Sequence, residues 1–394
     1  MPRAPRPEDV YRLRIATEPR LSPDGRLAVV TLQTVAPGFD GYRKAIWLVP
    51  TDGSREARQL TLGPGYDHAA RFSPDGRTLA FLSDRSALMD GRPGAPRARG
   101  TLERRERDAA AQVYLLPLDG GEARRLTALP RGVESFEWSP GGTRLVVVTA
   151  SRGATAGPDL PQREGPAPTG EDPGGPRTPP PSDYRFIDRL EYMLNGKGFT
   201  YDRVPHLWLV DATTGVASRL TDGPAADHDP AWSPDGRRIA FSSNRRRDHD
   251  LFGRQDIHVV DVETSAVSAV TRGPKSVFGW PVWLPDGSTI AALGHRLEGG
   301  AGSRNDIWLF AADGSDATSG GGRNLSGRHD LMPGSTMNSD VTVEGGPRLV
   351  PSANGRWIRF TAPIDGAYEL WRIAVDDGRL ERLTEGHHYV SGWD

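Results

Sequence analysis

The sequence has no cysteine, very little lysine and no long apolar run. Without cysteine there is no disulfide, no thiolate chemistry and no zinc–thiolate site. No segment approaches the roughly 18 apolar residues that a membrane-spanning helix needs, and residues 1–9 lack the apolar core of a signal peptide. Only three of the 49 basic residues are lysine, and the formal net charge is −2. We therefore expect a cytoplasmic protein whose partners include neither nucleic acid nor a membrane.

The signature motifs of several enzyme classes are missing as well. The 394 residues contain no G-x-S-x-G nucleophile elbow, no Walker A loop, no G-x-G-x-x-G after a strand and no H-E-x-x-H. The nine histidines are scattered along the chain. We therefore expect no catalytic residue, no metal site and no cofactor in this chain.

Turn-forming residues are abundant instead, and they recur as one phrase, Ser-Pro-Asp-Gly. Proline presets φ, aspartate can bond its own backbone and glycine accepts a positive φ, so the phrase predicts a tight turn between two strands. Six hairpins of this kind in series indicate a repeat protein. The copies, some of them degenerate, stand at residues 22–25, 73–76, 139–142, 233–236, 284–287 and 352–355.

Each copy of the phrase is embedded in the same pattern of short runs. A β-rich run leaves the turn, a later run often holds an aromatic residue such as Trp47 or Trp308, and a last run ends in Leu-Thr or a similar pair. Four short strands per repeat are typical of a β-propeller. We predict an all-β fold with six four-stranded blades, preceded by a short helix over residues 8–16. The predicted domains are a helical lead-in, residues 1–18, and a propeller, residues 19–394.

The last residues predict the start of a seventh blade. Ser73, Ser139 and Ser233 each follow the threonine that ends the preceding repeat by 12 residues. The same step from Thr384 passes position 394, so the sequence is expected to stop inside the first strand of a seventh blade. We therefore expect a fragment of a longer protein, marginally stable because its ring is open. A six-bladed propeller with a loose tail is the alternative.

Long insertions are predicted on one face of the ring. With strands a to d counted outward from the axis, the Pro-Asp-Gly turns join a to b on one face, and the b–c and d–a connections lie on the other. Residues 151–182 are rich in proline and glycine and are predicted to be flexible, whereas residues 183–205 mix aromatic and basic side chains and are predicted to be ordered. Insertions gathered on one face indicate the working face. They comprise residues 36–43, 84–111, 151–205, 244–255, 295–305 and 327–346.

Four polar clusters could have a function. Asp67-His68 and residues 227–229 look like metal ligands, but they occupy the same place in two repeats, which favours hydrogen bonding at a strand start. The histidine pair at residues 387–388 also favours a strand start. Residues 245–247, three arginines, lie at a b–c loop. They are either a solvated loop or a cluster that binds carboxylates or peptides, because arginine presents a bidentate fork.

Three stretches resemble a known family. They are residues 8–25, which contain Glu-Asp-Val-Tyr and the first turn; residues 184–208, which contain Tyr-Arg, Leu-Glu-Tyr, Gly-Lys-Gly-Phe and Pro-His-Leu-Trp; and residues 390–394, Val-Ser-Gly-Trp-Asp. Together they resemble the N-terminal propeller of the prolyl oligopeptidase family of serine peptidases, in its acylaminoacyl-peptidase branch. The Ser-Pro-Asp-Gly repeat is less specific, since TolB-type propellers share it.

This resemblance implies a seven-bladed propeller that caps a C-terminal α/β-hydrolase domain, with the catalytic Ser, Asp and His all beyond the propeller. That domain is absent from the sequence, so the chain alone is expected to be inactive. It would be a lid that selects short or N-acylated peptides, and homo-oligomerisation of the intact parent stays open. A TolB-like binding propeller and a propeller enzyme with a site in its own channel are the alternatives. The candidate substrate-binding residues are Arg185, Arg189, Arg245 and Arg247.

Overall fold

The computed structural model describes residues 3–4, 6–36, 41–62, 65–85, 111–151, 187, 190, 192–194, 198–200, 203–251, 253–317, 321–334 and 347–394. The strands of these residues form six four-stranded antiparallel sheets and one separate two-stranded ribbon. We number the four-stranded sheets blade 1 to blade 6 in chain order.

Blade 1 comprises β1 (Arg14–Leu21), β2 (Leu27–Val35), β3 (Tyr42–Pro50) and β4 (Arg58–Gln59). Blade 2 comprises β5 (Asp67–Phe72), β6 (Thr78–Ser83), β7 (Gln112–Pro117) and β8 (Arg124–Arg125). Blade 3 comprises β9 (Ser135–Trp138), β10 (Arg144–Ser151), β13 (Val204–Asp211) and β14 (Ala217–Arg219). Blade 4 comprises β15 (Asp227–Trp232), β16 (Arg238–Ser243), β17 (Asp256–Asp261) and β18 (Val267–Ala269). Blade 5 comprises β19 (Val277–Trp283), β20 (Thr289–His295), β21 (Asp306–Ala311) and β22 (Arg323–Asn324). Blade 6 comprises β23 (Val350–Pro351), β24 (Trp357–Ile364), β25 (Ala367–Ala374) and β26 (Leu380–Arg382). The ribbon pairs β11 (Met193–Leu194) with β12 (Gly198–Phe199), and a short 3-10 helix, η2 (Gly300–Gly302), precedes β21.

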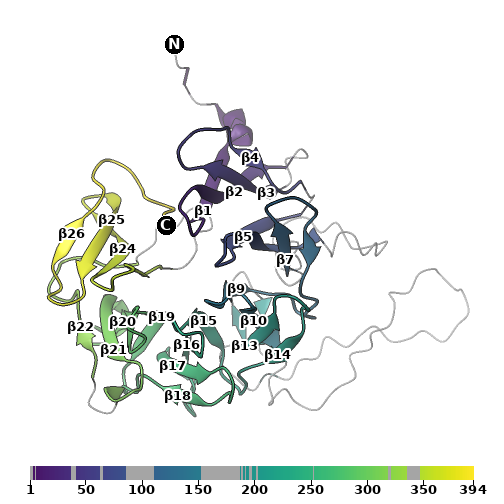
Figure 1. The fold of residues 1–394 in the computed structure, drawn as a ribbon. Helices are drawn as coiled ribbons and strands as arrows, with labels where there is room; N and C mark the ends of the chain where they lie inside the picture. Colours follow the sequence, from purple (N-terminus) through teal and green to yellow (C-terminus); the bar gives the residue numbers. More distant parts are fainter. Residues whose placement is uncertain are drawn as a thin grey trace, which may run out of the picture.

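The six blades surround a common axis, so the predicted β-propeller is confirmed (Figure 1). The first strand of a blade lies toward the axis and the last toward the outside, as β15 and β18 show in Figure 1. We call the end of the ring that has the Pro-Asp-Gly turns the turn face. The opposite end, where the second strand of each blade connects to the third, is the loop face.

The N-terminal lead-in differs from the prediction. The sequence predicts a helix over residues 8–16, but the structure has a 3-10 helix, η1 (Pro7–Arg12), and β1 begins at Arg14. Ile15 and Thr17 are β-branched and favour a strand, and Ile15 lies opposite Gln33 of β2. The first blade therefore begins at Arg14 and not at residue 19.

The Ser-Pro-Asp-Gly phrase forms the predicted turn, and blade 4 shows how. The Gly236 N–H donates to the Ser233 carbonyl at 2.9 Å, and Gly236 has a φ of +70°, which glycine adopts without steric cost. The Ser233 hydroxyl donates to Asp235 Oδ1 at 2.6 Å and accepts the Arg238 N–H at 2.9 Å. The corresponding glycines of all six blades have φ between +66° and +70°.

The turn serine should be important for stability. Replacing Ser233, which is fully buried, with alanine leaves the Arg238 N–H and Asp235 without their shared hydroxyl. We expect Ser233→Ala to lower the free energy of unfolding by about 1–2 kcal/mol, measured by urea denaturation. Ser268→Ala, at an exposed position of β18, is the matched control and should stay within about 0.5 kcal/mol of the parent.

A second repeated contact joins the outermost strand of each blade to the third strand. The side-chain oxygen of the threonine or serine that ends each repeat accepts a backbone N–H at 2.9–3.0 Å in every blade. This contact explains why each repeat ends in an apolar residue followed by threonine or serine. The pairs are Ile46–Thr61, Val113–Thr127, Leu207–Thr221, Ile257–Thr271, Ile307–Ser326 and Leu370–Thr384.

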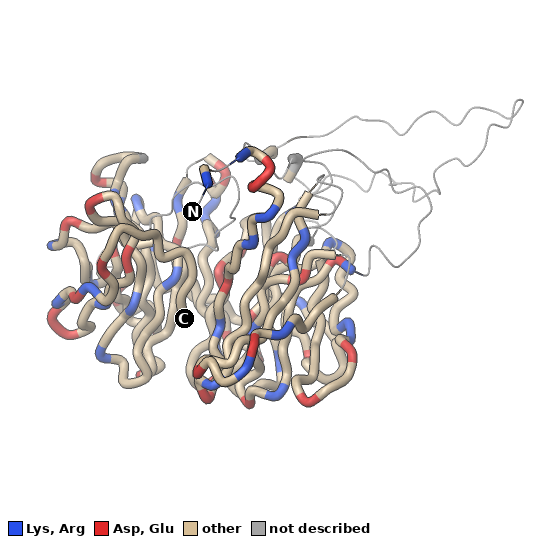
Figure 2. The backbone as a smooth tube through the Cα atoms, turned by 90° about the horizontal axis from the view of Figure 1, so that it is seen from above, with Lys and Arg blue, Asp and Glu red and all other residues tan. Residues whose placement is uncertain are grey.

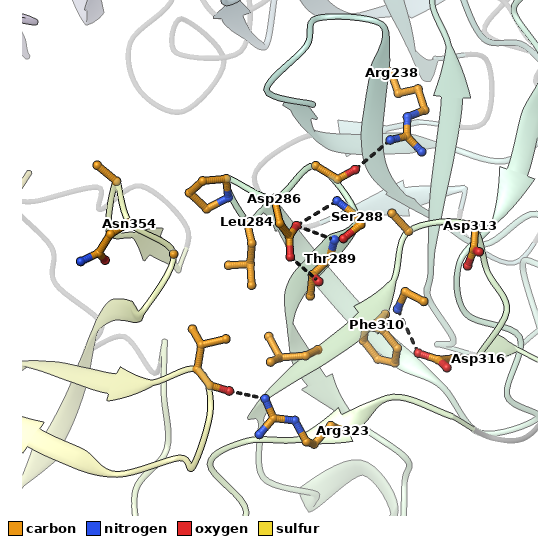
Figure 3. Close-up of a pocket in the computed structure, with 18 residues that line it drawn as sticks. Arg238, Leu284, Asp286, Ser288, Thr289, Phe310, Asp313, Asp316, Arg323 and Asn354 are labelled. Carbon is orange, nitrogen blue, oxygen red and sulfur yellow. Dashed lines mark hydrogen bonds between the residues drawn. The ribbon is translucent and has the colours of Figure 1, made fainter.

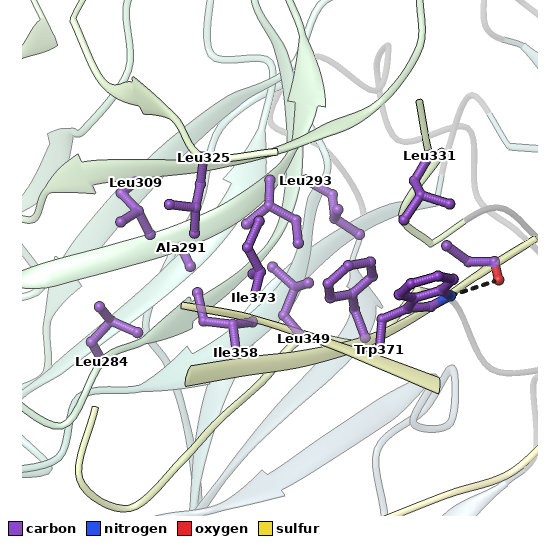
Figure 4. Close-up of a cluster of buried hydrophobic side chains, with 13 residues drawn as sticks. Leu284, Ala291, Leu293, Leu309, Leu325, Leu331, Leu349, Ile358, Trp371 and Ile373 are labelled. Atoms are coloured by element: carbon purple, nitrogen blue, oxygen red, sulfur yellow. Dashed lines mark hydrogen bonds between the residues drawn. The ribbon is translucent and has the colours of Figure 1, made fainter. Parts of the chain in front are cut away.

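The hydrophobic core lies between neighbouring blades. Figure 4 shows the cluster between blades 5 and 6, where Leu293 and Leu309 face Ile358, Trp371 and Ile373. Similar clusters join blades 1 and 2, 2 and 3, 3 and 4, and 4 and 5. Within the described ranges, no such cluster joins blade 6 to blade 1.

The last ten residues fill part of the gap between blades 6 and 1. Tyr389 forms a parallel bridge with Tyr368 of β25. Equivalent parallel bridges, at Tyr66 and Val277, stand where the chain starts the first strands of blades 2 and 5. Residues 389–394 therefore lie where the first strand of a further blade would lie, but only Tyr389 forms a β-bridge, and the described residues form six blades. The start of a seventh blade stays a prediction. We call these six residues the tail strand.

Acidic and basic residues are mixed along the backbone, without a segregated region of one sign (Figure 2). This distribution agrees with the net charge of −2. None of the helices in the described part of the chain is long and apolar enough to cross a membrane.

Candidate functional site

The best-developed polar network of the loop face lies at the end of blade 4. Asp227 begins β15 there, Arg245 follows β16, and His206 lies in β13 of the neighbouring blade. Strand order explains the convergence, because first strands begin and second strands end at the loop face. The network brings together residues that are up to 39 positions apart in the sequence, counted from His206 to Arg245.

Asp227 is the centre of this network and is fully buried. Its Oδ2 accepts the Thr221 hydroxyl at 2.7 Å, lies 3.0 Å from His206 Nδ1 and is 2.7 Å from Arg245 Nη2. Burial opposes ionisation of this carboxyl, but the hydrogen bond from His206 and the charge of Arg245 lower its pKa below the usual value. Asp227 is therefore a carboxylate at neutral pH.

Arg245 is held on two sides. Its Nε and Nη2 donate to the two carboxylate oxygens of Asp227, and its guanidinium lies 5.3 Å from the ring centre of Phe241. The His258 ring stacks on Phe241 at 5.6 Å. Burial lowers the pKa of His258 to about 4, so this ring is neutral at physiological pH. The result is a rigid and largely closed network.

Blade 2 repeats part of this arrangement. Asp67 begins β5 and pairs with Arg85 Nη2 at 2.6 Å, and the Arg85 guanidinium lies 5.3 Å from the Phe81 ring centre. Asp67 and Asp227 therefore hold the loop ends of their blades by hydrogen bonds and ion pairs, which confirms the interpretation of both as strand-start residues. In the described part of the chain, no group of three or more potential ligands could hold a metal ion.

Two of the four predicted substrate-binding residues are placed by the structure. Arg245 is engaged with Asp227, and Arg247 is an exposed residue of the same loop. Arg185 and Arg189 lie outside the described residues. The Leu190 N–H donates to Asp250 at 3.3 Å, so the long insertion approaches the loop that follows β16. Binding of peptides by these arginines stays a prediction.

His206 was not singled out from the sequence. It is fully buried, and its Nε2 has no hydrogen-bond partner among the described residues. A lone histidine next to the Leu-Trp-Leu-Val run resembles an ordinary strand residue, so only the three-dimensional contact with Asp227 distinguishes it. Thr221 is not available as a nucleophile, since its buried hydroxyl donates to Asp227 and accepts the Leu207 N–H. This network can hold the loops in place and present Arg247, but it does not contain an exposed nucleophile beside a base.

A pocket of about 940 Å³ lies on the opposite side, between the turns of blades 5 and 6 (Figure 3). Several of its charged side chains already bond the backbone, either in their own turn or in a neighbouring blade. Asp286 accepts the Ser288 and Thr289 N–H groups at 2.8 and 2.9 Å, and Arg238 donates to the Gly287 carbonyl at 2.8 Å. This pocket has few polar groups left for a ligand, and we do not favour it as the functional site.

Known proteins similar to this chain include two named as peptidases. The chain is 32% identical to the uncharacterized peptidase YuxL of Bacillus subtilis over 253 residues, which cover 64% of this chain and 33% of YuxL. It is 22% identical to dipeptidyl-peptidase 5 of Porphyromonas gingivalis over 401 residues, or 97% of this chain and 49% of that protein. The match thus spans half or less of each relative. No family model matches the chain.

Among solved structures, acylaminoacyl peptidase of Pyrococcus horikoshii has the same fold over 98% of this chain and 48% of its own, with a TM-score of 0.64 at 16% identity. The resemblance to the propeller portion of prolyl oligopeptidase-family peptidases is confirmed. A match to TolB of Bordetella pertussis, 35% identical, covers only 20% of this chain and 13% of that protein.

Proposed function

We propose that this propeller is the gating and substrate-selecting lid of a cytoplasmic serine peptidase that hydrolyses short or N-acylated peptides. The observation that supports it best is the extent of the match to dipeptidyl-peptidase 5, which includes 97% of this chain but 49% of the relative. The remaining half of such a protein is where the resemblance places an α/β-hydrolase domain and its catalytic triad. That domain is the first partner we propose.

The geometry supports a lid because this chain forms both the loop face and the strands that surround the axis of the ring. The η1 helix and the start of β1 lie at the loop face, where the insertions also emerge. A hydrolase domain seated against this face would be reached by substrates that fit the axis of the ring or the gaps between loops. Such a passage admits short peptides and excludes folded proteins, and Arg247 is an exposed group on this face.

A comparison of activities tests this proposal. We expect the purified 394-residue chain to release no chromophore from an N-acetyl-peptide p-nitroanilide. We expect the polypeptide encoded together with its downstream sequence to do so, and to lose the activity after treatment with a serine-directed phosphonate. The same extended protein should cleave a peptide of about ten residues much faster than a folded protein that contains the same sequence.

The competing function, a TolB-like binding propeller, predicts a different outcome. A stop codon directly after residue 394, or no serine nucleophile within the next several hundred residues, would contradict the peptidase proposal and favour a binding module. Turnover by the 394-residue chain itself would contradict both, since it would require a catalytic site within the propeller.

A further inference from the structure

Five charged residues converge near the axis on the side of the turn face. Arg20, Arg71 and Glu137 occupy equivalent positions in the first strands of blades 1, 2 and 3, opposite Val29, Ala80 and Val146 of the second strands. Arg348 precedes β23 of blade 6, and Asp394 lies at the end of the tail strand. We call these five residues the axial cluster: Arg20, Arg71, Glu137, Arg348 and Asp394.

Two of the three arginines in the axial cluster have acidic partners. Arg71 Nε lies 3.6 Å from Glu137 Oε1, and Arg348 Nη2 lies 2.5 Å from Asp394 Oδ1. Arg20 differs, because its Nη1 donates a hydrogen bond to the backbone carbonyl of Pro19 at 2.7 Å and not to a carboxylate. Within the described residues, Arg20 has no carboxylate within ion-pair distance. It is thus the unmatched positive charge of the cluster.

Electrostatics agrees with this contact pattern. Burial lowers the pKa of Arg20 to about 9, and the positive charges of Arg71 and Arg348 act in the same direction. Glu137 and Asp394 oppose the shift with smaller effects. A half-buried guanidinium that lacks an acidic partner is costly to the fold, and an anion that binds beside it removes that cost.

Among the described residues, first strands and the tail strand lie around Arg20 on the side of the axis. First strands are nearest the axis, and the tail strand occupies the next first-strand position after blade 6. The Leu21 N–H donates to Asp394 Oδ2 at 2.8 Å, which fixes the tail strand directly beside Arg20.

An aromatic ring belongs to the same cluster of residues. The Trp393 ring is half-buried and lies 5.2 Å from the Arg348 guanidinium. A ligand that matches both features has a carboxylate joined to an apolar side chain, which describes the C-terminal residue of a short peptide.

We propose that Arg20, flanked by Arg71 and Arg348, binds the terminal carboxylate of short apolar peptides at the turn-face end of the axis. Arginine suits this task because its planar fork can donate two parallel hydrogen bonds to one carboxylate. The site is distinct from the loop-face arginines, and it consists only of residues of this chain. Its test therefore does not depend on the proposed peptidase activity.

Calorimetric titration of the 394-residue chain at low salt tests the site. The probes are N-acetyl-alanyl-alanyl-leucine with a free carboxylate, the C-terminal amide of the same peptide, and acetate. We expect the acid to bind at least about tenfold more tightly than either the amide or acetate. Arg20→Gln should weaken binding of the acid by about tenfold, and Arg20→Lys by less, because lysine keeps the charge but loses the fork.

Arg26→Gln is the matched control, because Arg26 is an exposed arginine near the first turn whose ion-pair contact, to Asp24, is 4.0 Å long. The Arg26→Gln variant should bind the acid like the parent. Because Arg20 has no ion-pair partner to lose, Arg20→Gln should melt at or above the temperature of the parent, which separates a binding role from a structural one. Equal affinity for acid and amide, or unchanged affinity in Arg20→Gln, would overturn the proposal. Acetate bound as tightly as the peptide would overturn the assignment to peptides.

Discussion

Replacing Asp227 with alanine is expected to lower the free energy of unfolding by about 3 kcal/mol or more. The substitution leaves the Arg245 guanidinium and the buried His206 ring without their common partner, and removal of one member of a buried ion pair typically costs about 3–5 kcal/mol. Thr221 also loses its acceptor. Urea denaturation followed by circular dichroism measures the effect.

Asp235→Ala is the matched control for this change. Asp235 is an exposed turn carboxylate in the same blade, and its loss removes a hydrogen bond from Ser233 but no buried ion pair. We expect a loss of about 1 kcal/mol there. If the Asp227 and Asp235 variants were equally stable, the buried network would contribute no more than a surface turn, and our account of it would be wrong.

The Asp227 effect should depend on pH in a defined direction. The folded-state pKa of Asp227 is lower than its unfolded value of about 3.9. The stabilisation is therefore fully present above the unfolded pKa and is lost as the pH falls through the folded pKa. The difference in unfolding free energy between parent and Asp227→Ala should be constant from pH 7 to about pH 5 and shrink at lower pH. A difference that grew on acidification would contradict the charge assignment.

The second large effect is expected at Gly215, in the turn between the outer strands of blade 3. A Cβ at this position would lie 2.3 Å from the backbone carbonyl oxygen of Leu126 in blade 2, and Gly215 has a φ of +73°. Ser265 adopts a φ of +57° at the same place in blade 4, so the left-handed backbone alone is tolerated with a side chain. We therefore expect Gly215→Ala to cost about 3 kcal/mol, mostly from the clash between blades.

Gly53→Ala distinguishes the clash from the backbone strain. Gly53 stands in the corresponding turn of blade 1 with a φ of +67°, but no atom lies within 4 Å of its Cβ position. We expect a cost of about 1 kcal/mol from the backbone conformation alone. Thermal and urea unfolding of both variants decide the point, and equal losses would show that blades 2 and 3 can move apart to accept a methyl group.

The sequence predicts the features of this protein that are local. The Pro-Asp-Gly turns, the threonines that end the repeats and the strand-start position of Asp67 depend on neighbours within one blade, and all are found as expected. The step of 12 residues, which follows Thr61, Thr127 and Thr221, agrees with the position of the tail strand after Thr384. The helix expected over residues 8–16 failed because β2 pairs with Ile15 and outcompetes the weak helical preference.

Contacts between blades were less predictable. His206 meets Asp227 only because blade 3 packs against blade 4, and nothing in the short motif around His206 indicates this pairing. Arg20 gains its importance from Arg71, Arg348 and Asp394, whose sequence positions are up to 374 residues away. Single-sequence patterns report on neighbours along a strand, whereas the ring determines which strands meet at the axis.

The tail strand gives the ring one seam that differs in kind from the others. In the described ranges, apolar clusters join consecutive blades from 1 to 6, but blade 6 meets blade 1 through polar contacts of Arg348, Asp394 and Leu21. Water and salt compete with polar contacts far more effectively than with a packed apolar face. Among the junctions of the described residues, the one between blades 6 and 1 is therefore expected to weaken most when salt is added.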